Sequence, residues 1–257
     1  MNVSSATEIV YLSQTAPVSM GDAWFEIASL SHFWIQRRFD VLRRMTRGLK
    51  WQGLSVAEIG CGNGLLQRQC EDAFGISVDG FDLNEFALQQ NLSRRSRVFC
   101  YNISDKLDHL QGKYDFVLLF DVLEHINNEA AFLQEVQFHI KKGGTLIVNV
   151  PADQSLFSAY DRAAGHVRRY SGEQLRQVLD ESGLSAATWT YWGLPLIPFL
   201  VARKILLRKR INDKEILEAG FRPPSSIINW LLGAVSRCER IPQHMNGSSV
   251  MMLATRP

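Results

Sequence analysis

Short apolar runs recur along the middle of the chain, separated by stretches of mixed polarity. The runs predict strands over 54–59, 76–81, 97–101, 115–120 and 144–150, and helices are expected between them over 64–73, 84–93 and 129–140. The fourth run, residues 116–120, is apolar on both faces, as expected of a central strand in a parallel sheet. Strands that alternate with helices predict an α/β fold with a doubly wound, parallel sheet.

Residues on either side of this core carry different patterns. The first 25 or so have no clear period, whereas apolar residues from Ile35 to Leu49 recur at three- and four-residue steps, which predicts an amphipathic helix with arginines on its other face. Residues 171–174, Ser-Gly-Glu-Gln, have capping-box spacing, so a helix is expected over 172–182. Strands over 185–192 and 249–255 complete a seven-stranded sheet. The expected units are a helical cap (1–50), a core (51–192), a helical insertion or lid (193–248) and a final strand (249–257).

Composition narrows the class of protein only slightly. The 257 residues are 46% hydrophobic and 21% charged, which suits one α/β domain with an elaboration. The four cysteines include no Cys-x-x-Cys pair, so neither a zinc site nor a disulfide framework is indicated. The first 21 residues are polar and lack the apolar run of a signal peptide, so a cytoplasmic protein is expected. A net charge of +2 indicates no nucleic-acid partner.

The most informative segment is the turn after the first core strand, where residues 58–64 read Glu-Ile-Gly-Cys-Gly-Asn-Gly. Glycines allow a ligand to approach the main chain closely. The acidic Glu58 offers lone pairs to hydroxyls or an ammonium group, and it repels a pyrophosphate. Asp82, at the end of the second strand, can accept hydrogen bonds from ribose hydroxyls. That spacing alone also fits an NAD(P)-dependent oxidoreductase, although a dinucleotide turn has the spacing Gly-x-Gly-x-x-Gly.

These motifs, with the run from Asp115 to Ile126, resemble the class I S-adenosylmethionine-dependent methyltransferases over roughly residues 30–192. The resemblance implies a Rossmann-like, seven-stranded, mostly parallel sheet with one antiparallel strand, supplied by residues 250–254. It implies S-adenosyl-L-methionine as the cofactor and methyl transfer as the activity. A protein that binds this cofactor without catalysis, as a scaffold, is a further alternative.

The resemblance also implies the cofactor contacts. The main chain at Gly60 and Gly62 would run past the methionine part of the cofactor, and Asp82 would hold the ribose. Leu83 would pack on the adenine, and the side chain of Asn102 would meet its amino group, although many relatives have aspartate there. The full set of expected cofactor contacts is Glu58, Gly60, Cys61, Gly62, Asp82, Leu83, Asn102, Ile103, Asp121 and Arg38.

Two further segments resemble a bacterial subgroup of these enzymes that is associated with cell-envelope and polysaccharide genes. They are His32-Phe33-Trp34 with Arg38, and residues 151–170. The resemblance implies that the opening helix lies over the cofactor and that Arg38 pairs with the methionine carboxylate. Alternatively, Arg38 is a solvated helix charge and Trp34 a core residue.

The acceptor site is expected in residues 151–170, which follow the fifth strand at the carboxyl edge of the sheet. This segment concentrates polar residues within ten positions, too many for a buried connection: Asp161, His166, Arg168, Arg169 and Tyr170. We hypothesise that His166 removes a proton from an acceptor hydroxyl. With Asp161 and His125 it forms the candidate catalytic set, although His166 and the arginines could instead only brace the loop. The expected acceptor is a small molecule, a glycan or a lipid-linked precursor. Nucleic-acid bases are unlikely acceptors, because no Asn/Asp-Pro-Pro-aromatic turn follows the fourth strand.

Asp121, Glu124 and His125 are spaced as on one face of a helical turn and could bind a divalent cation, as in quinone-precursor O-methyltransferases. Leu-Glu-His is also common in relatives for which no metal need be assumed, and no metal is predicted here.

The region 194–210 combines an apolar stretch with the basic cluster Arg208-Lys209-Arg210. The stretch is too short, and too interrupted by proline, to span a bilayer. It fits either a peripheral contact with the inner face of an anionic membrane or a lid or dimer contact. A second amphipathic stretch follows at 227–232. The pattern does not predict the oligomeric state.

Overall fold

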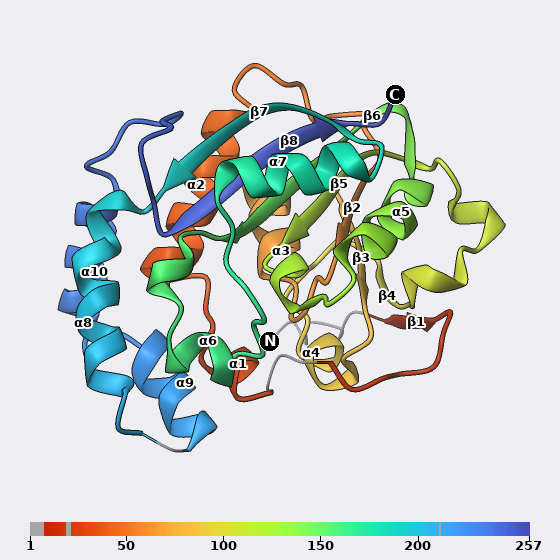
Figure 1. Ribbon diagram of the computed structural model, residues 1–257. Helices are drawn as coiled ribbons and strands as arrows, with labels where there is room; N and C mark the ends of the chain where they lie inside the picture. The colour runs from red at the N-terminus through yellow and green to blue at the C-terminus, as the bar shows by residue number, and fades with distance from the viewer. Residues whose placement is uncertain (1–7, 19–21, 211) are drawn as a thin grey trace.

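The computed structural model describes residues 8–18, 22–210 and 212–257. Within these ranges, eight strands form one sheet in the order β1-β4-β3-β2-β5-β6-β8-β7 (Figure 1). The strands are β1 (Ile9–Tyr11), β2 (Val56–Ile59), β3 (Asp79–Asp82), β4 (Val98–Cys100), β5 (Tyr114–Phe120), β6 (Ile140–Pro151), β7 (Ser185–Trp192) and β8 (Ser249–Thr255). The helices are α1 (Asp22–Ile27), α2 (Phe33–Met45), α3 (Leu65–Phe74), α4 (Glu85–Gln89), α5 (Glu129–His139), α6 (Ala159–Ala163), α7 (Gly172–Glu181), α8 (Ile197–Leu207), α9 (Asp213–Phe221) and α10 (Ser226–Ser236).

The predicted α/β sheet is confirmed, but the number of strands was wrong. β1 lies in the stretch that has no period and pairs in parallel with β4 at the edge of the sheet. A three-residue strand is too short to show an alternating pattern, so no periodicity indicated it. β8 pairs antiparallel with both β6 and β7, so this one strand makes both antiparallel pairs.

The side chains of β5 alternate between two hydrophobic cores, one on each face of the sheet. Val117 and Leu119 lie in the core that α5 and α7 cover. Leu118 and Phe120 lie in the core that α2 and α3 cover. This double burial explains why residues 116–120 are apolar without alternation.

Helices α8, α9 and α10 occupy the segment after β7. α9 packs against α1 and α6, and α10 packs against α2, so these helices lie beside the carboxyl ends of the central strands (Figure 1). A small core of Tyr160, Leu207 and Ile216 joins α6, α8 and α9. Within the described ranges, no helix combines the length and the apolar character that a bilayer crossing requires.

Candidate active site

A cavity of about 990 Å³ lies at the carboxyl ends of β2, β3 and β5. This volume is at the upper end of the range for small-molecule sites, roughly 300–1,000 Å³, so it suits a cofactor together with an acceptor. All ten residues that the sequence predicts as cofactor contacts line it. Of the three predicted catalytic residues, His125 and His166 line the cavity, whereas Asp161 lies behind His166.

The glycine turn after β2 has a conformation and surroundings that exclude other residues. Gly60 and Gly62 both have positive φ, 75° and 51°. A Cβ atom on Gly60 would lie 2.3 Å from Cγ2 of Val122, and one on Gly62 would lie 2.6 Å from Cε1 of Phe25. The turn therefore runs against both the loop after β5 and helix α1, and only glycine fits there.

Asp82, at the end of β3, fixes the same turn. Its Oδ2 accepts a hydrogen bond from the Gly62 N–H at 2.8 Å, and its Oδ1 accepts from the N–H groups of Leu83 and Asn84 at 2.7 and 2.9 Å. Burial raises the pKa of Asp82, and these three hydrogen bonds oppose that shift. A carboxylate has about four acceptor sites, so about one direction remains for a ligand.

Glu58 closes β2 with a buried carboxylate. Its side chain is nearly inaccessible, and its Oε2 has no hydrogen-bond partner among the described residues. Burial raises its pKa to about 8, although the positive charge of Arg38 opposes the shift. The site therefore contains an acidic group for which the described protein residues supply too little positive charge.

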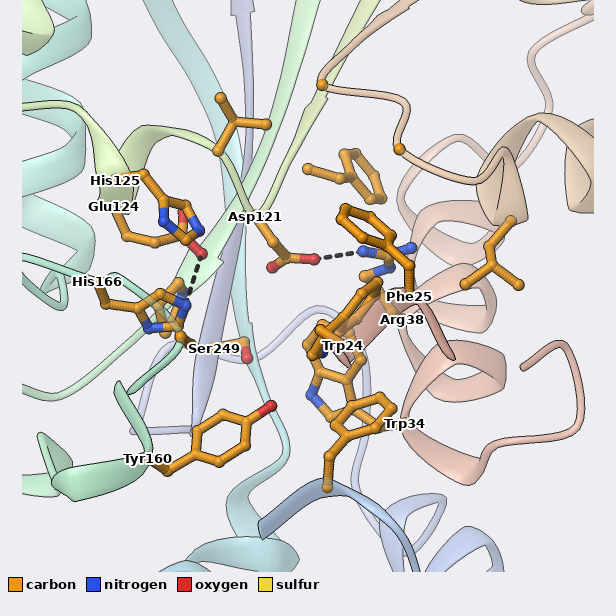
Figure 2. Close-up of a pocket in the computed structure, with 18 of the residues that line it drawn as sticks. Trp24, Phe25, Trp34, Arg38, Asp121, Glu124, His125, Tyr160, His166 and Ser249 are labelled. Carbon is orange, nitrogen blue, oxygen red and sulfur yellow. Dashed lines mark hydrogen bonds and ion pairs between the residues drawn. The ribbon is translucent and has the colours of Figure 1, made fainter. Parts of the chain in front are cut away.

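Arg38 reaches the cavity from α2 and forms an ion pair with Asp121 (Figure 2). Asp121 also accepts a hydrogen bond from Nδ2 of Asn149 at 2.8 Å. The guanidinium of Arg38 lies 5.1 Å from the ring centroid of Trp34, and Arg38 is only 5% exposed. Arg38 is thus not a solvated helix charge, and its contact with a methionine carboxylate stays a prediction.

Asn102 follows β4 and caps a short 3₁₀ turn. Its Oδ1 accepts a hydrogen bond from the N–H of Ser104 at 3.1 Å, and its own N–H donates to Ser13 Oγ at 2.9 Å. The side chain lines the cavity, and its predicted contact with the adenine amino group stays a prediction.

His166 and Asp161 form a pair at the acceptor side of the cavity. Nδ1 of His166 lies 3.2 Å from Oδ1 of Asp161. The other carboxylate oxygen of Asp161 accepts from the N–H and Oγ of Ser158 at 2.8 and 2.9 Å, and Nε of Arg169 donates to Oδ1 at 2.8 Å. Burial alone would raise the pKa of Asp161, but the hydrogen bond from His166 and the charge of Arg169 bring it well below its usual range.

The expectation that this segment is too polar to be buried was wrong. Asp161, Arg169 and Tyr170 are all buried. Asp161 and Arg169 compensate each other's charge, and the hydroxyl of Tyr170 donates to Glu129. Polar residues can be buried when each finds a partner, and residue composition alone does not reveal those partners.

Glu124 and His125 lie beside His166 (Figure 2). The carboxylate of Glu124 is fully buried, which raises its pKa well above the usual range, and its Oε1 lies 3.8 Å from Nε2 of His166. Burial lowers the pKa of His125 to about 3, and its Nδ1 lies 3.2 Å from the Gly165 carbonyl. Ligand atoms of Glu124, His125 and His166 all lie within 4.8 Å of one another, so these three could hold a metal ion.

This cluster differs from the one expected from sequence spacing. Asp121 has a φ of 58° and precedes the 3₁₀ turn Leu123–His125, rather than sharing a helical turn with it. Its carboxylate therefore points toward Arg38, away from Glu124 and His125 (Figure 2). His166, which is distant in sequence, takes the third position.

The sequence did not single out several residues that enclose the cavity. Trp24 and Phe25 come from α1, in the stretch without a period, and Tyr160 comes from α6 (Figure 2). Arg203 of α8 lies 4.1 Å from the ring centroid of Tyr160 and donates to the Gly220 carbonyl at 2.9 Å. Tyr160 lies in the polar segment after the fifth strand and Arg203 in the expected lid, whereas no sequence pattern indicated Trp24 or Phe25.

A family model described as a methyltransferase domain matches residues 32–188, more than half of the chain. The chain belongs to the class I S-adenosylmethionine-dependent methyltransferase family. The family's cofactor is S-adenosylmethionine, and the alternative of an NAD(P)-dependent oxidoreductase is not favoured.

Relatives of this methyltransferase family differ in acceptor. The rat mitochondrial ubiquinone biosynthesis O-methyltransferase is 27% identical over 165 residues, which cover 55% of this chain and 47% of the rat protein. The chain spans less than half the length of the ubiquinone O-methyltransferases it matches. The structure resembles Haemonchus contortus phosphoethanolamine N-methyltransferase 2 in complex with S-adenosyl-L-methionine, with a TM-score of 0.59, 16% identity and coverage of 92% of this chain and 57% of that one. It also resembles an Archaeoglobus fulgidus S-adenosylmethionine-dependent methyltransferase, with a TM-score of 0.51, 17% identity and coverage of 85% and 94%.

Proposed function

We propose that this methyltransferase transfers a methyl group from S-adenosylmethionine to a hydroxyl oxygen of a small-molecule, glycan or lipid-linked acceptor, with His166 as the general base. The cofactor supplies an electrophilic methyl group on a sulfonium. The acceptor oxygen bonds to the methyl carbon as the sulfur–methyl bond breaks and its electron pair stays on sulfur. The hydroxyl proton passes to Nε2 of His166.

The Asp161–His166 pair beside the cavity is the observation that supports this proposal. An ionised Asp161 accepts the Nδ1 hydrogen of His166, so the free lone pair of the imidazole lies on Nε2. Nε2 forms no hydrogen bond within the described chain, and the oxygen of Glu124 at 3.8 Å is beyond hydrogen-bond distance. The buried negative charge of Asp161 would stabilise the imidazolium that forms.

The cofactor side fits the same proposal. The unpartnered carboxylate of Glu58 suits the ammonium group of a methionine moiety, and the glycine turn lets that moiety approach the main chain. Asp82 would use its remaining acceptor direction for a ribose hydroxyl. The resemblance of residues 32–34 and 151–170 to enzymes of cell-envelope gene sets supports a glycan or lipid-linked acceptor.

The experiment compares His166→Ala with the wild type on a panel of catechol, sugar and polyprenyl-linked hydroxyl compounds, with release of S-adenosylhomocysteine as the readout. Loss of a general base should lower turnover by about 10²–10⁴-fold, while affinity for the cofactor by calorimetry stays unchanged. The matched control is His109→Ala, because His109 is exposed and outside the cavity. Wild-type turnover by His166→Ala on an acceptor that the enzyme methylates would refute the assignment of the base.

A further inference from the structure

Helices α8 and α10 expose large apolar side chains to solvent. Ile205 on α8 is 68% exposed, and Ile227 and Trp230 on α10 are each 69% exposed. On α10, Ile227, Trp230 and the 44% exposed Leu231 lie at i, i+3 and i+4, on one face of the helix. Both helices adjoin the 3₁₀ turn Leu194–Leu196 and lie at the same edge of the molecule (Figure 1). A cluster of this kind marks an interaction surface rather than scattered surface residues.

Basic residues accompany the apolar ones. Residues 194–210 contain five lysines and arginines and no acidic residue. Lys204 donates to the Ser155 carbonyl at 2.6 Å, so its charge is directed inward. Arg208 and Lys209 are exposed, and neither forms an ion pair with any described carboxylate. We call Ile205, Arg208, Lys209, Ile227, Trp230 and Leu231 the α8–α10 surface.

The cavity opens beside the α8–α10 surface. Phe199 and Leu206 of α8 are 51% and 75% exposed, yet both also line the cavity. The exposed Arg210 and Arg222 line it too. A molecule that entered between these side chains would pass from an apolar, positively charged exterior into the cavity that holds His166.

We propose that the α8–α10 surface docks on an anionic membrane and that a lipid-linked acceptor enters the cavity from there. Apolar side chains beside unpaired cations fit the boundary between acyl chains and anionic headgroups. A two-fold contact between copies through this surface would instead bring the unpaired cations of both copies to one interface. The proposed docking depends only on the properties of the α8–α10 surface, whereas the entry of the acceptor rests on the proposed function.

The experiment is co-sedimentation of the full chain with vesicles of phosphatidylcholine, alone or mixed with phosphatidylglycerol. The wild type should sediment with the anionic vesicles and lose binding at high salt. Each basic residue near an anionic surface contributes about fivefold to partitioning, so Arg208→Gln with Lys209→Gln should lower binding by about 10- to 30-fold. The matched control, Arg47→Gln with Lys50→Gln, removes the same charge from exposed residues beyond the end of α2, and it should bind like the wild type.

A second variant tests the apolar part. Ile205→Ser with Trp230→Ser should weaken vesicle binding by about tenfold or more, with an unchanged far-ultraviolet circular dichroism spectrum and unchanged affinity for S-adenosylhomocysteine. A wild type that stays in the supernatant with anionic vesicles would overturn the docking. Equal losses in the Arg208/Lys209 variant and its control would overturn it as well, as would a wild-type dimer that the serine variant converts to a monomer without any vesicle binding. Vesicle binding requires neither acceptor nor turnover, so its outcome is independent of the role of His166.

Discussion

Glu58→Gln should remove a loss of stability that the ligand-free wild type shows as the pH rises from 5 to 8. Burial raises the pKa of Glu58 from 4.5 to about 8. Between these values the folded state keeps a proton that the unfolded state releases, so the free energy of unfolding falls as the pH rises. At about 1.4 kcal/mol per pKa unit, the unfolding free energy of the wild type should be lower by about 3 kcal/mol at pH 7 and about 4 kcal/mol at pH 8 than at acidic pH. Glutamine does not titrate, so the variant escapes this loss.

The assay is urea unfolding of both proteins, without ligand, at pH 5, 6, 7 and 8. The quantity of interest is how the difference in unfolding free energy changes with pH, because the buried amide adds an offset that does not depend on pH. Glu173→Gln is the control, since Glu173 is exposed and outside the cavity. A difference between Glu58→Gln and the wild type that stays constant from pH 5 to 8 would refute the reasoning.

The same substitution should weaken cofactor binding, although it makes the stability of the protein less dependent on pH. A hydrogen bond to a charged group contributes about 1.5–3 kcal/mol, so affinity for S-adenosylmethionine at pH 8 should fall by about 10- to 100-fold. At pH 7 the wild type must also release a proton from Glu58 when it binds an ammonium group. Calorimetry in buffers of different ionisation enthalpy measures this release. Equal proton release by the variant would show that Glu58 does not contact the ammonium.

Three further results are expected. Gly62→Ala forces a Cβ against Phe25 at a positive φ, so the unfolding free energy should fall by about 1–3 kcal/mol; an unchanged melting temperature would contradict this. Arg38→Met leaves Asp121 without its cation, so the free energy of unfolding should fall by about 3–5 kcal/mol. Adding Asp121→Asn to the same chain should recover part of this loss, as measured by thermal unfolding. A chelator should leave turnover unchanged, because the role proposed for His166 is that of a base and not of a metal ligand. If chelation abolishes turnover and a divalent cation restores it, the base assignment fails.

The sequence predicted the centre of the sheet, and it grouped the residues that line one side of the cavity, because both depend on local patterns. Buried parallel strands are continuous apolar runs, so β2 and β5 were recognisable. The carboxyl ends of parallel strands meet at one edge of the sheet, so the positions of Glu58 and Asp82 at two strand ends predict that they lie near each other.

Contacts between distant segments limited the prediction elsewhere. α4 ends at Gln89, although its pattern extended to residue 93, because Asn91 donates to Gln67 at 2.9 Å and the Leu92 N–H donates to the Asn63 carbonyl at 2.9 Å. These bonds join the chain to α3 and to the glycine turn, so they replace the next helical turn. The position of His166 beside Glu124 also depends on a contact between distant segments. It could not be predicted, because no periodic pattern connects a loop after β6 with a turn after β5.

Each end of the cavity contains a buried acid with oxygens that have no hydrogen-bond partner among the described residues, Glu124 at the acceptor end and Glu58 at the other, but the nearby groups that can carry positive charge differ. At the acceptor end, Glu124 lies 3.8 Å from Nε2 of His166, which becomes a cation when it accepts a proton, and Asp161 has Arg169 and Ser158 as partners. At the other end, Glu58 has an oxygen without a partner. An unpaired buried carboxylate is unfavourable until a cation arrives. We therefore expect the positively charged methionine end of the cofactor beside Glu58 and the uncharged acceptor hydroxyl beside His166.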